Sequence, residues 1–295
     1  MAVFTGAGVA IVTPFRENKE VDFDKLGELI DYQVEHKTDA IVIVGTTGEA
    51  STLTHEEHIE CIRYAVQRTA GRVPVVAGTG SNCTETAIYL TGEAKAAGAD
   101  AALVVTPYYN KATQKGLIAH YGAIATAVDI PIIMYNVPGR TGCNILPATA
   151  ATLVKQYDNI VGIKDATGNM AQTVEMMERC DGRIDLYSGE DGIIVPILSV
   201  GGKGVISVLS NVAPEDTHRI VELFLQGDLK GSMELQIKYA ALVRALFCEV
   251  NPIPVKKALE LMGLSAGTLR SPLTPMEPEH AELLRAEMKK VGILA

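Results

Sequence analysis

The sequence predicts an α/β protein, a (β/α)8 TIM barrel with a C-terminal helical extension. Short, nearly continuous runs of β-branched and aliphatic residues recur eight times, as in parallel strands that are covered on both faces. Amphipathic helical patterns lie between these runs, and strand–helix alternation through eight units favours a closed barrel. A doubly wound open sheet is the alternative, but the first strand follows Gly6 and Gly8 without the third glycine of the dinucleotide-binding pattern.

The elements follow one another in a regular order. The expected strands lie at 8–15, 40–45, 73–80, 101–109, 130–138, 160–167, 184–191 and 202–209. Helical patterns between the first strands lie at 22–36, 54–69 and 83–98. Helical patterns also continue beyond the last strand, at 217–228, 231–247, 251–263 and 278–292. Because the first of these can be the eighth barrel helix, we predict a barrel over residues 1–226 and a helical region over 227–295 that packs on the barrel or on another subunit.

Composition narrows the class of protein. The 295 residues are 47% hydrophobic and carry a formal net charge of −9, which allows a large core and disfavours a nucleic-acid partner. The five cysteines are widely spaced without a C-x-x-C, so we expect them to be reduced. No secretory pattern and no apolar run of about 18 residues is present, which predicts a cytoplasmic protein without a membrane partner.

In such barrels the functional residues lie at the carboxyl ends of the strands, where the βα-loops meet at one mouth. The ends of the predicted strands carry a short set of polar segments. One of these segments contains Gly189, which is a candidate for substrate binding. The segments are Gly45–Glu49, Tyr108–Asn110, Tyr135–Arg140, Lys164–Asp165 and Ser188–Asp191.

Lys164 is the most informative of these residues, because lysine is rarely buried and this one lies in the apolar strand VGIKDA. Alternation places Gly162 and Lys164 on one face of the strand, which we expect to be the barrel interior. Burial disfavours the charged form of the amine, and a neutral amine can attack a ketone to form an imine. The alternative is a buried lysine that is paired with a carboxylate, such as Asp165 or Glu190.

Other groups at the predicted mouth suit imine chemistry, and each also has an ordinary structural interpretation. Tyr135 could donate a proton to the carbinolamine oxygen, or be a rim aromatic whose hydroxyl bonds the backbone. Thr46, Thr47 and Gly48 could hold a carboxylate, or form a strand-ending turn. Arg140 could grip a substrate carboxylate at two points, or make a surface salt bridge.

Two further patterns have simpler interpretations. His55 and His58 do not have the spacing of a zinc-protease motif and lack an evident third ligand, so we expect no metal. Glu49, Glu56 and Glu57 are expected to stabilise the first turn of the following helix, because acidic side chains are favourable near a helix N-terminus.

Taken together, these segments resemble the dihydrodipicolinate synthase / N-acetylneuraminate lyase family over nearly the whole chain. The resemblance rests on GTTGE, YNVPGRTG and GIKDATG in this order and spacing, with VAIVTPF, AGTGSN, VTPYYN, YSGEDG and GGKGVISVLSN. Sialic-acid lyases lack the arginine segment NVPGRTG, so the synthase branch is the better match. The resemblance implies a lyase without a cofactor, which condenses pyruvate with L-aspartate 4-semialdehyde in the diaminopimelate route to lysine.

The resemblance also implies catalytic roles for matching residues. Lys164 matches the Schiff-base lysine, and Tyr135 matches the tyrosine that relays protons. Thr46 matches the hydroxyl between that tyrosine and a second one, which Tyr109 matches and which comes from a neighbouring subunit.

Substrate-binding roles are implied in the same way. Thr47 matches a threonine that holds the carboxylate of pyruvate, and Ile206 matches a residue that lines the pyruvate site through its backbone. Arg140 matches the arginine that binds the carboxylate of the semialdehyde.

Family members are usually homotetramers, built as a pair of tight dimers, and many are inhibited by L-lysine at the tight interface. The glutamate of the lysine-site pattern aligns with Thr86, while Glu85 lies one position earlier, so lysine inhibition is left open. The residues that match the pattern are Ala50, Ser51, His55, His58, Asn82 and Tyr108.

Two other functions remain as alternatives. A lyase that cleaves a keto-acid sugar would use the same imine chemistry, and Arg140 argues against it. The second alternative is a non-catalytic barrel that only binds a ligand. The presence of Lys164, Tyr135 and Thr46 argues against it.

Overall fold

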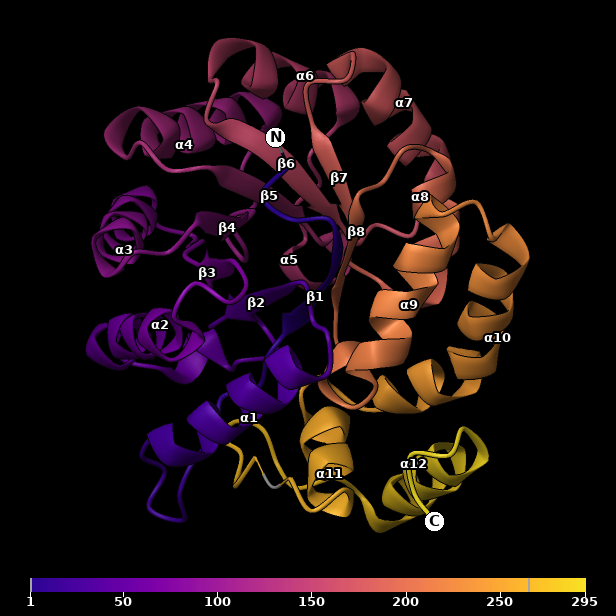
Figure 1. Cartoon of the computed structure of the whole chain (residues 1–295). Helices are drawn as coiled ribbons and strands as arrows, with labels where there is room; N and C mark the ends of the chain where they lie inside the picture. The colour runs from indigo at the N-terminus through magenta and orange to yellow at the C-terminus, as the bar shows by residue number, and fades with distance from the viewer. Residues whose placement is uncertain (1, 265) are drawn as a thin grey trace.

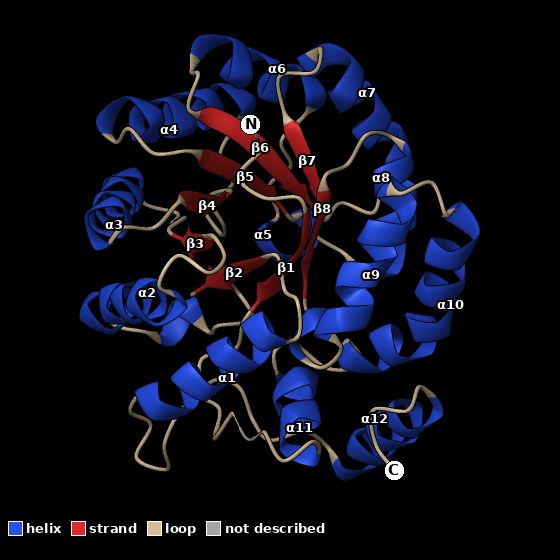
Figure 2. Ribbon diagram, in the orientation of Figure 1, coloured by secondary structure: helices blue, strands red, loops and turns tan. Residues whose placement is uncertain are grey.

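The computed structural model describes residues 2–264 and 266–295. Its centre is a closed barrel of parallel strands in which each strand pairs with its neighbours in the sequence and β1 pairs with β8. Figures 1 and 2 show the strands inside a ring of helices. The predicted barrel is therefore confirmed. The strands are β1 (Gly6–Ala10), β2 (Ala40–Ile43), β3 (Val75–Gly78), β4 (Ala101–Val105), β5 (Ile132–Asn136), β6 (Ile160–Asp165), β7 (Asp185–Ser188) and β8 (Gly204–Ser207).

The apolar runs form strands because both of their faces are covered. In β5, Ile133 and Tyr135 belong to the cluster inside the barrel, whereas Ile132 and Met134 pack in the layer between strands and helices. The stacked rings of Phe4 and Tyr187, with centroids 4.5 Å apart, fill the barrel beside the start of β1. The observed strands are shorter than the apolar runs, which extend into the flanking loops, and β1 begins at Gly6, two residues before its predicted run.

The helices of the barrel follow the strands as expected. The patterns at 22–36, 54–69 and 83–98 form α1, α2 and α3 with bounds that agree to within two residues. The one-turn helix α5 was not expected; it begins at Pro138 and carries Arg140. The barrel helices are α1 (Phe23–Glu35), α2 (His55–Thr69), α3 (Thr84–Ala97), α4 (Gln114–Ala127), α5 (Pro138–Thr141), α6 (Pro147–Gln156), α7 (Met170–Cys180), α8 (Ile194–Ser199) and α9 (Pro214–Leu225).

The C-terminal helices pack directly on the barrel. They are α10 (Leu229–Leu246), α11 (Ile253–Leu261) and α12 (Pro278–Lys290). In Figure 1, α10 lies outside α8 and α9, and α11 lies between α1 and α12. Leu242, Val255 and Leu284 share one buried cluster with barrel residues such as Val9 and Ile62. The division between residues 226 and 227 stays a prediction, since side chains on both sides of it belong to one core.

A helix that spans a membrane must be both long and apolar. Within residues 2–264 and 266–295, no helix combines enough length with enough hydropathy to cross a bilayer.

Candidate active site

A cavity of 360 Å³ opens at the carboxyl ends of the strands. This volume lies at the lower end of the range for small-molecule sites, roughly 300–1,000 Å³. We call it the catalytic cavity. Its walls come from the loop after β2, from β5, β6 and the turn after β7, and from the C-terminal region. The polar and charged lining residues are Thr46, Thr47, Tyr135, Arg140, Lys164, Glu190, Arg244 and Asn251.

Lys164 lies inside the barrel, near the end of β6, and is 7% exposed. It pairs in register with Tyr135 of β5, and its Nζ lies 4.3 Å from the centre of the Tyr135 ring. Gly162 shares its face but lies one layer deeper, where an added Cβ would meet Ile133 at 3.3 Å. The lysine amine therefore lies against the aromatic ring of Tyr135 at the wall of the catalytic cavity.

The carboxylates near Lys164 do not pair with it. Asp165 accepts hydrogen bonds from the backbone of Thr167 at 2.9 Å and from the hydroxyl of Thr173 at 2.6 Å. In the described parts of the chain, no ion pair joins Lys164 to Asp165 or Glu190. The predicted alternative of a structural ion pair is therefore wrong for the residues that the structure describes.

Asp191 is a buried acid that joins the turns after β7 and β8. Its Oδ2 accepts from the backbone N–H groups of Val208 and Leu209 at 3.0 and 2.9 Å. Burial raises the pKa of Asp191, while hydrogen bonds from Ser207 and the backbone and the charge of Lys164 oppose that rise. It lies two residues beyond Gly189 and holds the turn after β7 against the turn after β8.

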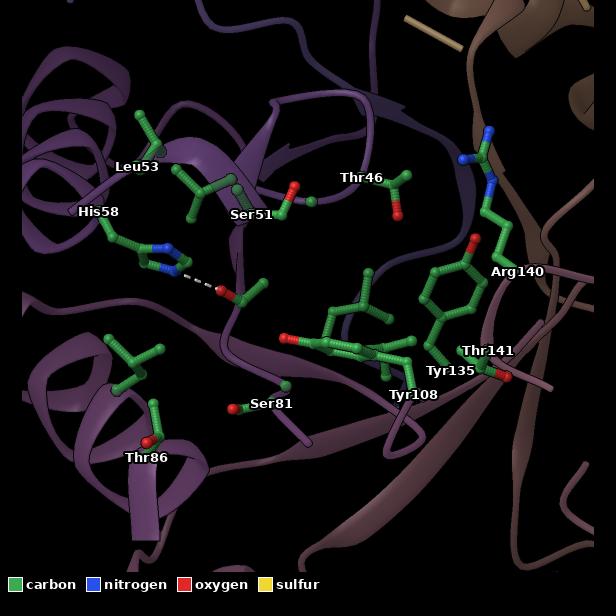
Figure 3. A pocket seen from close by; sticks show the side chains of 18 of the residues that line it. Thr46, Ser51, Leu53, His58, Ser81, Thr86, Tyr108, Tyr135, Arg140 and Thr141 are labelled. Carbon is green, nitrogen blue, oxygen red and sulfur yellow. Dashed lines mark hydrogen bonds between the residues drawn. The ribbon is translucent and has the colours of Figure 1, made fainter. Parts of the chain in front are cut away.

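Three side chains converge on the space above Lys164. Thr46, Tyr135 and Arg140 line the catalytic cavity and also a second, adjoining cavity of 410 Å³. Figure 3 shows them around one space, with Tyr135 between Arg140 and Tyr108. Within residues 2–264 and 266–295, no hydrogen bond occupies the hydroxyl of Tyr135 or Thr46, and no ion pair occupies Arg140. These groups are free to meet a ligand.

The remaining predicted substrate residues differ in their access to the cavity. Thr47 is 2% exposed and lines it. Gly189 also lines it, and an added Cβ there would lie 3.1 Å from Cε of Lys164. Ile206 is buried in the interior cluster and is not among the described residues that line the cavity.

The loop after β2 is held in a strained conformation. Val44 has φ +48° and Glu49 has φ +53°, a region that costs a β-branched residue such as Val44 roughly 1–3 kcal/mol. The Thr13 hydroxyl donates to the carbonyl of Gly48 at 2.7 Å. This contact from outside the loop helps to keep its backbone in place.

Glu49 contributes to that restraint, so its predicted role at the start of a helix is wrong. Its Oε1 lies 2.5 Å from Nζ of Lys256 in α11, and both side chains are almost fully buried. Burial lowers the pKa of Lys256 to about 8, although Glu49 opposes this shift. Glu56 and Glu57 do lie in the first turn of α2, as predicted.

The second cavity brings together most of the residues that match the lysine-site pattern. His58 is buried there, and its Nε2 lies 2.7 Å from the carbonyl oxygen of Gly78, the bond that is dashed in Figure 3. Because Nε2 must donate to that carbonyl, Nδ1 is left as the acceptor. Burial lowers the pKa of His58, which favours this neutral form. The pattern residues that line the cavity are Ala50, Ser51, His55, His58 and Tyr108, together with Thr86.

Three predicted residues of the described chain line neither cavity, namely Ile206, Asn82 and Tyr109. Asn82 is not a lining residue in the described chain; its carbonyl accepts from the amide of Asn110 at 2.9 Å. Tyr109 has φ +73° and is 91% exposed, so its side chain points away from Thr46 and Tyr135 of its own chain.

Residues of the C-terminal region that line the catalytic cavity were missed by the sequence analysis. Val243, Arg244 and Phe247 come from the end of α10 and the turn after it, and Asn251 follows. The motif NPIP at 251–254 falls within a predicted helix, but α11 begins only at Ile253, so Asn251 lies in the turn before it. The sequence signal for a functional residue here is an asparagine that precedes two prolines in a segment that is otherwise apolar.

Comparisons with known proteins agree with this geometry. The profile of the dihydrodipicolinate synthetase family matches residues 3–291. A 4-hydroxy-tetrahydrodipicolinate synthase of Lachnoclostridium phytofermentans is 66% identical over 294 residues, which is 100% of both chains.

Solved structures agree as well. Chloride-inhibited dihydrodipicolinate synthase of Acinetobacter baumannii, complexed with pyruvate, is 46% identical with a TM-score of 0.96, covering 98% of this chain and 99% of that one. The lysine-bound enzyme of Cyanidioschyzon merolae is 40% identical with a TM-score of 0.97 over 100% of both chains. The chain therefore belongs to the dihydrodipicolinate synthetase family.

Proposed function

We propose that the chain condenses pyruvate with L-aspartate 4-semialdehyde through an imine on Lys164, giving 4-hydroxy-tetrahydrodipicolinate and water. The chain is thus a lyase of the diaminopimelate route to lysine. The observation that carries the proposal is a buried lysine that is unpaired within the described residues and faces a small cavity with Tyr135, Thr46 and Arg140. The name that the relatives share, 4-hydroxy-tetrahydrodipicolinate synthase, supports the same reaction.

The first half of the reaction builds the imine. Once it has lost its proton, Nζ of Lys164 attacks C2 of pyruvate to give a carbinolamine, and a proton delivered to the carbinolamine oxygen lets water leave. The Tyr135 hydroxyl is proposed to deliver that proton, because its ring lies against the lysine amine. Thr47 is proposed to hold the carboxylate of pyruvate, and the backbone at Gly189 to line the space around its methyl group, whereas Ile206 packs in the interior cluster.

The second half forms the carbon–carbon bond and closes the ring. Loss of a proton from C3 of the imine gives an enamine, whose C3 attacks the aldehyde carbon of the second substrate. The resulting alkoxide takes up a proton, for which we propose the relay through Thr46 and Tyr135. The amino group of the semialdehyde then attacks the imine carbon, closes the ring and expels the amine of Lys164, so that one water is released overall.

Arg140 is proposed to bind the carboxylate of the semialdehyde at the mouth of the cavity. Replacing it with alanine is expected to raise the KM of the semialdehyde about tenfold or more, which corresponds to at least roughly 1.4 kcal/mol of binding energy. The KM of pyruvate should change much less, because pyruvate is held deeper, beside Lys164. Steady-state rates with each substrate varied in turn check this.

The matched control is Arg179→Ala, which removes an exposed arginine of α7 whose partner is Glu175. It should leave both KM values unchanged. An Arg140→Ala enzyme whose two KM values rise equally would contradict the assigned role. Rates with keto-acid sugars in the same assay test the alternative lyase function, for which a sugar substrate should outperform the semialdehyde.

We further propose a homotetramer, a dimer of dimers, in which Tyr109 of the partner subunit completes the proton relay. The exposed side chain of Tyr109, held by its unusual φ, supports this because it reaches away from its own cavity. An aromatic side chain that is 91% exposed is costly to leave in water and suits an interface.

A mixing experiment tests the shared site. Lys164→Ala and Tyr109→Phe subunits should each be nearly inactive alone, yet a mixture that exchanges subunits should regain about one quarter of the wild-type rate. Half of the dimers are then mixed, and each mixed dimer has one site with an intact lysine and an intact tyrosine. A mixture of Lys164→Ala with Lys164→Gln subunits is the control and should stay inactive. No recovery in the first mixture would mean that Tyr109 does not act across the interface.

L-Lysine is proposed to bind in the second cavity as an inhibitor. Thr46, Tyr135 and Arg140 line both cavities, so an occupant of one can alter the other. Thr86 lines the cavity where the family pattern has a glutamate, which removes a partner for the ammonium group and favours weak inhibition. Titration of the initial rate with L-lysine, with D-lysine as the control, tests this, and an equal response to both would oppose it.

A cytoplasmic location is proposed as well. Its support is that all five cysteines are free thiols in the structure, as expected in a reducing compartment.

A further inference from the structure

Asn251 lies outside the barrel strands and yet reaches the catalytic cavity. It follows α10, is 5% exposed and lines the cavity beside Thr47. Its Nδ2 donates a hydrogen bond of 2.9 Å to Oγ1 of Thr47, which lies 204 positions earlier in the sequence. This bond joins the C-terminal region to the loop that is proposed to hold the carboxylate of pyruvate.

The direction of that bond decides what the threonine can offer a ligand. A hydroxyl has one hydrogen to donate and two lone pairs that accept. Because Asn251 occupies a lone pair of Oγ1, and no acceptor for the hydroxyl hydrogen lies within the described residues, that hydrogen is free to point into the cavity. A carboxylate can only accept, so a threonine held as a donor is the form that binds it.

The surroundings fix both partners of the bond. Two residues beyond Thr47, Glu49 is tied to Lys256 of α11 by the buried ion pair and to the backbone N–H of Arg270 at 3.1 Å. These contacts hold the loop and the segment around Asn251 against each other. The amide oxygen of Asn251 is buried without a partner in the described chain, so the amide makes no hydrogen bond there except through Nδ2.

We propose that Asn251 is a positioning residue that keeps the hydroxyl of Thr47 turned toward the cavity as a donor to the carboxylate of pyruvate. The proposal rests on the proposed function and deepens it, because it assigns part of the pyruvate site to the C-terminal region. In the opposite orientation of the amide, Thr47 would donate to the amide oxygen, and an aspartate would leave that bond in place because it also accepts. Its effect on the KM of pyruvate would then be the same with and without the Thr47 hydroxyl.

The test is Asn251→Asp, which keeps the shape of the side chain and reverses its hydrogen bonding. An ionised aspartate can only accept, so it would draw the hydroxyl of Thr47 away from the cavity and add a negative charge beside a substrate carboxylate. Near pH 8 the KM of pyruvate should rise about tenfold or more relative to wild type, while the KM of the semialdehyde changes about twofold or less.

The pH dependence separates this role from a merely structural one. Burial disfavours the ionised aspartate, and a protonated carboxyl can donate to Thr47 again. The ratio of the variant's pyruvate KM to the wild-type value, measured at each pH, should therefore fall as the pH falls from 8 toward 6. In an Asn251→Asp, Thr47→Val double variant the aspartate should add a smaller loss than it does in the presence of Thr47, because its charge remains but the hydroxyl that it misdirects is absent.

Asn159→Asp is the matched control. The amide of Asn159 donates to the carbonyls of Ala125 and Val128 at 2.9 and 3.1 Å, far along the chain from the catalytic loop. This change should lower thermal stability without altering the ratio of the two KM values or its pH dependence. If Asn251→Asp does not fold, as judged by circular dichroism, Asn251→Ala takes its place and must still raise the KM of pyruvate more than that of the semialdehyde.

Trapping of the imine distinguishes a failure of the proposed function from a failure of the role of Asn251. Trapping of the imine with borohydride at varied pyruvate concentrations measures pyruvate binding without the second substrate. A wild-type enzyme that forms no adduct on Lys164 would overturn the proposed function itself. An adduct in the wild type, with a pyruvate dependence that is unchanged in Asn251→Asp or a KM ratio that does not vary with pH, would overturn only the role of Asn251.

Discussion

Replacing Lys164 with alanine is expected to lower turnover by roughly three orders of magnitude or more and to abolish imine trapping, because the side chain supplies the nucleophile itself. The fold should survive. Lys164 has no ion pair within the described residues, so its removal leaves no buried carboxylate without a partner. The coupled rate assay and circular dichroism of the same sample check both parts.

The control is Lys155→Ala, which removes an exposed lysine of α6. It should keep the wild-type rate and the adduct. Turnover close to normal in the Lys164→Ala enzyme would refute the covalent mechanism, whereas loss of rate together with loss of folded structure would mean that Lys164 also supports the core.

Gly189→Ala is expected to lower kcat roughly tenfold to a hundredfold, because small displacements of a reacting group are costly. An added Cβ would lie 2.7 Å from Cβ of Ala166 and 3.1 Å from Cε of Lys164. The first contact is closer than side chains tolerate, so the strand ends must shift and carry the lysine with them. A single-turnover measurement of imine formation should show the same loss as kcat.

Gly192→Ala is the matched change, since an added Cβ there meets only a carboxylate oxygen of Glu190 at 3.5 Å. It should leave imine formation unchanged. If Gly189→Ala formed the imine at the wild-type rate, the close packing of Gly189 against Lys164 would not matter for catalysis.

The barrel could be predicted from the sequence because its signals are local. Each strand is a short apolar run that must be covered on both faces, and eight of them in alternation with helices leave few topologies. The inward direction of Lys164 followed from the two-residue period of a strand. These features need no knowledge of which segments meet in space.

The missing parts of the site depend on contacts between distant segments. Asn251 reaches Thr47, and Lys256 reaches Glu49, across about two hundred positions. Nothing in the local pattern around Glu49 distinguishes a helix-start carboxylate from one that is buried against α11. Tyr109 illustrates the same limit, because its outward direction depends on a positive φ in a loop.

The central claim is that the amine of Lys164 forms a covalent imine with pyruvate. Incubation with pyruvate and borohydride, followed by digestion and mass spectrometry, tests it most directly. The account predicts that the reduced pyruvate adduct appears on the peptide that contains Lys164 and is absent without pyruvate. An unmodified Lys164 peptide, or an adduct found only on another lysine such as Lys256, would contradict it.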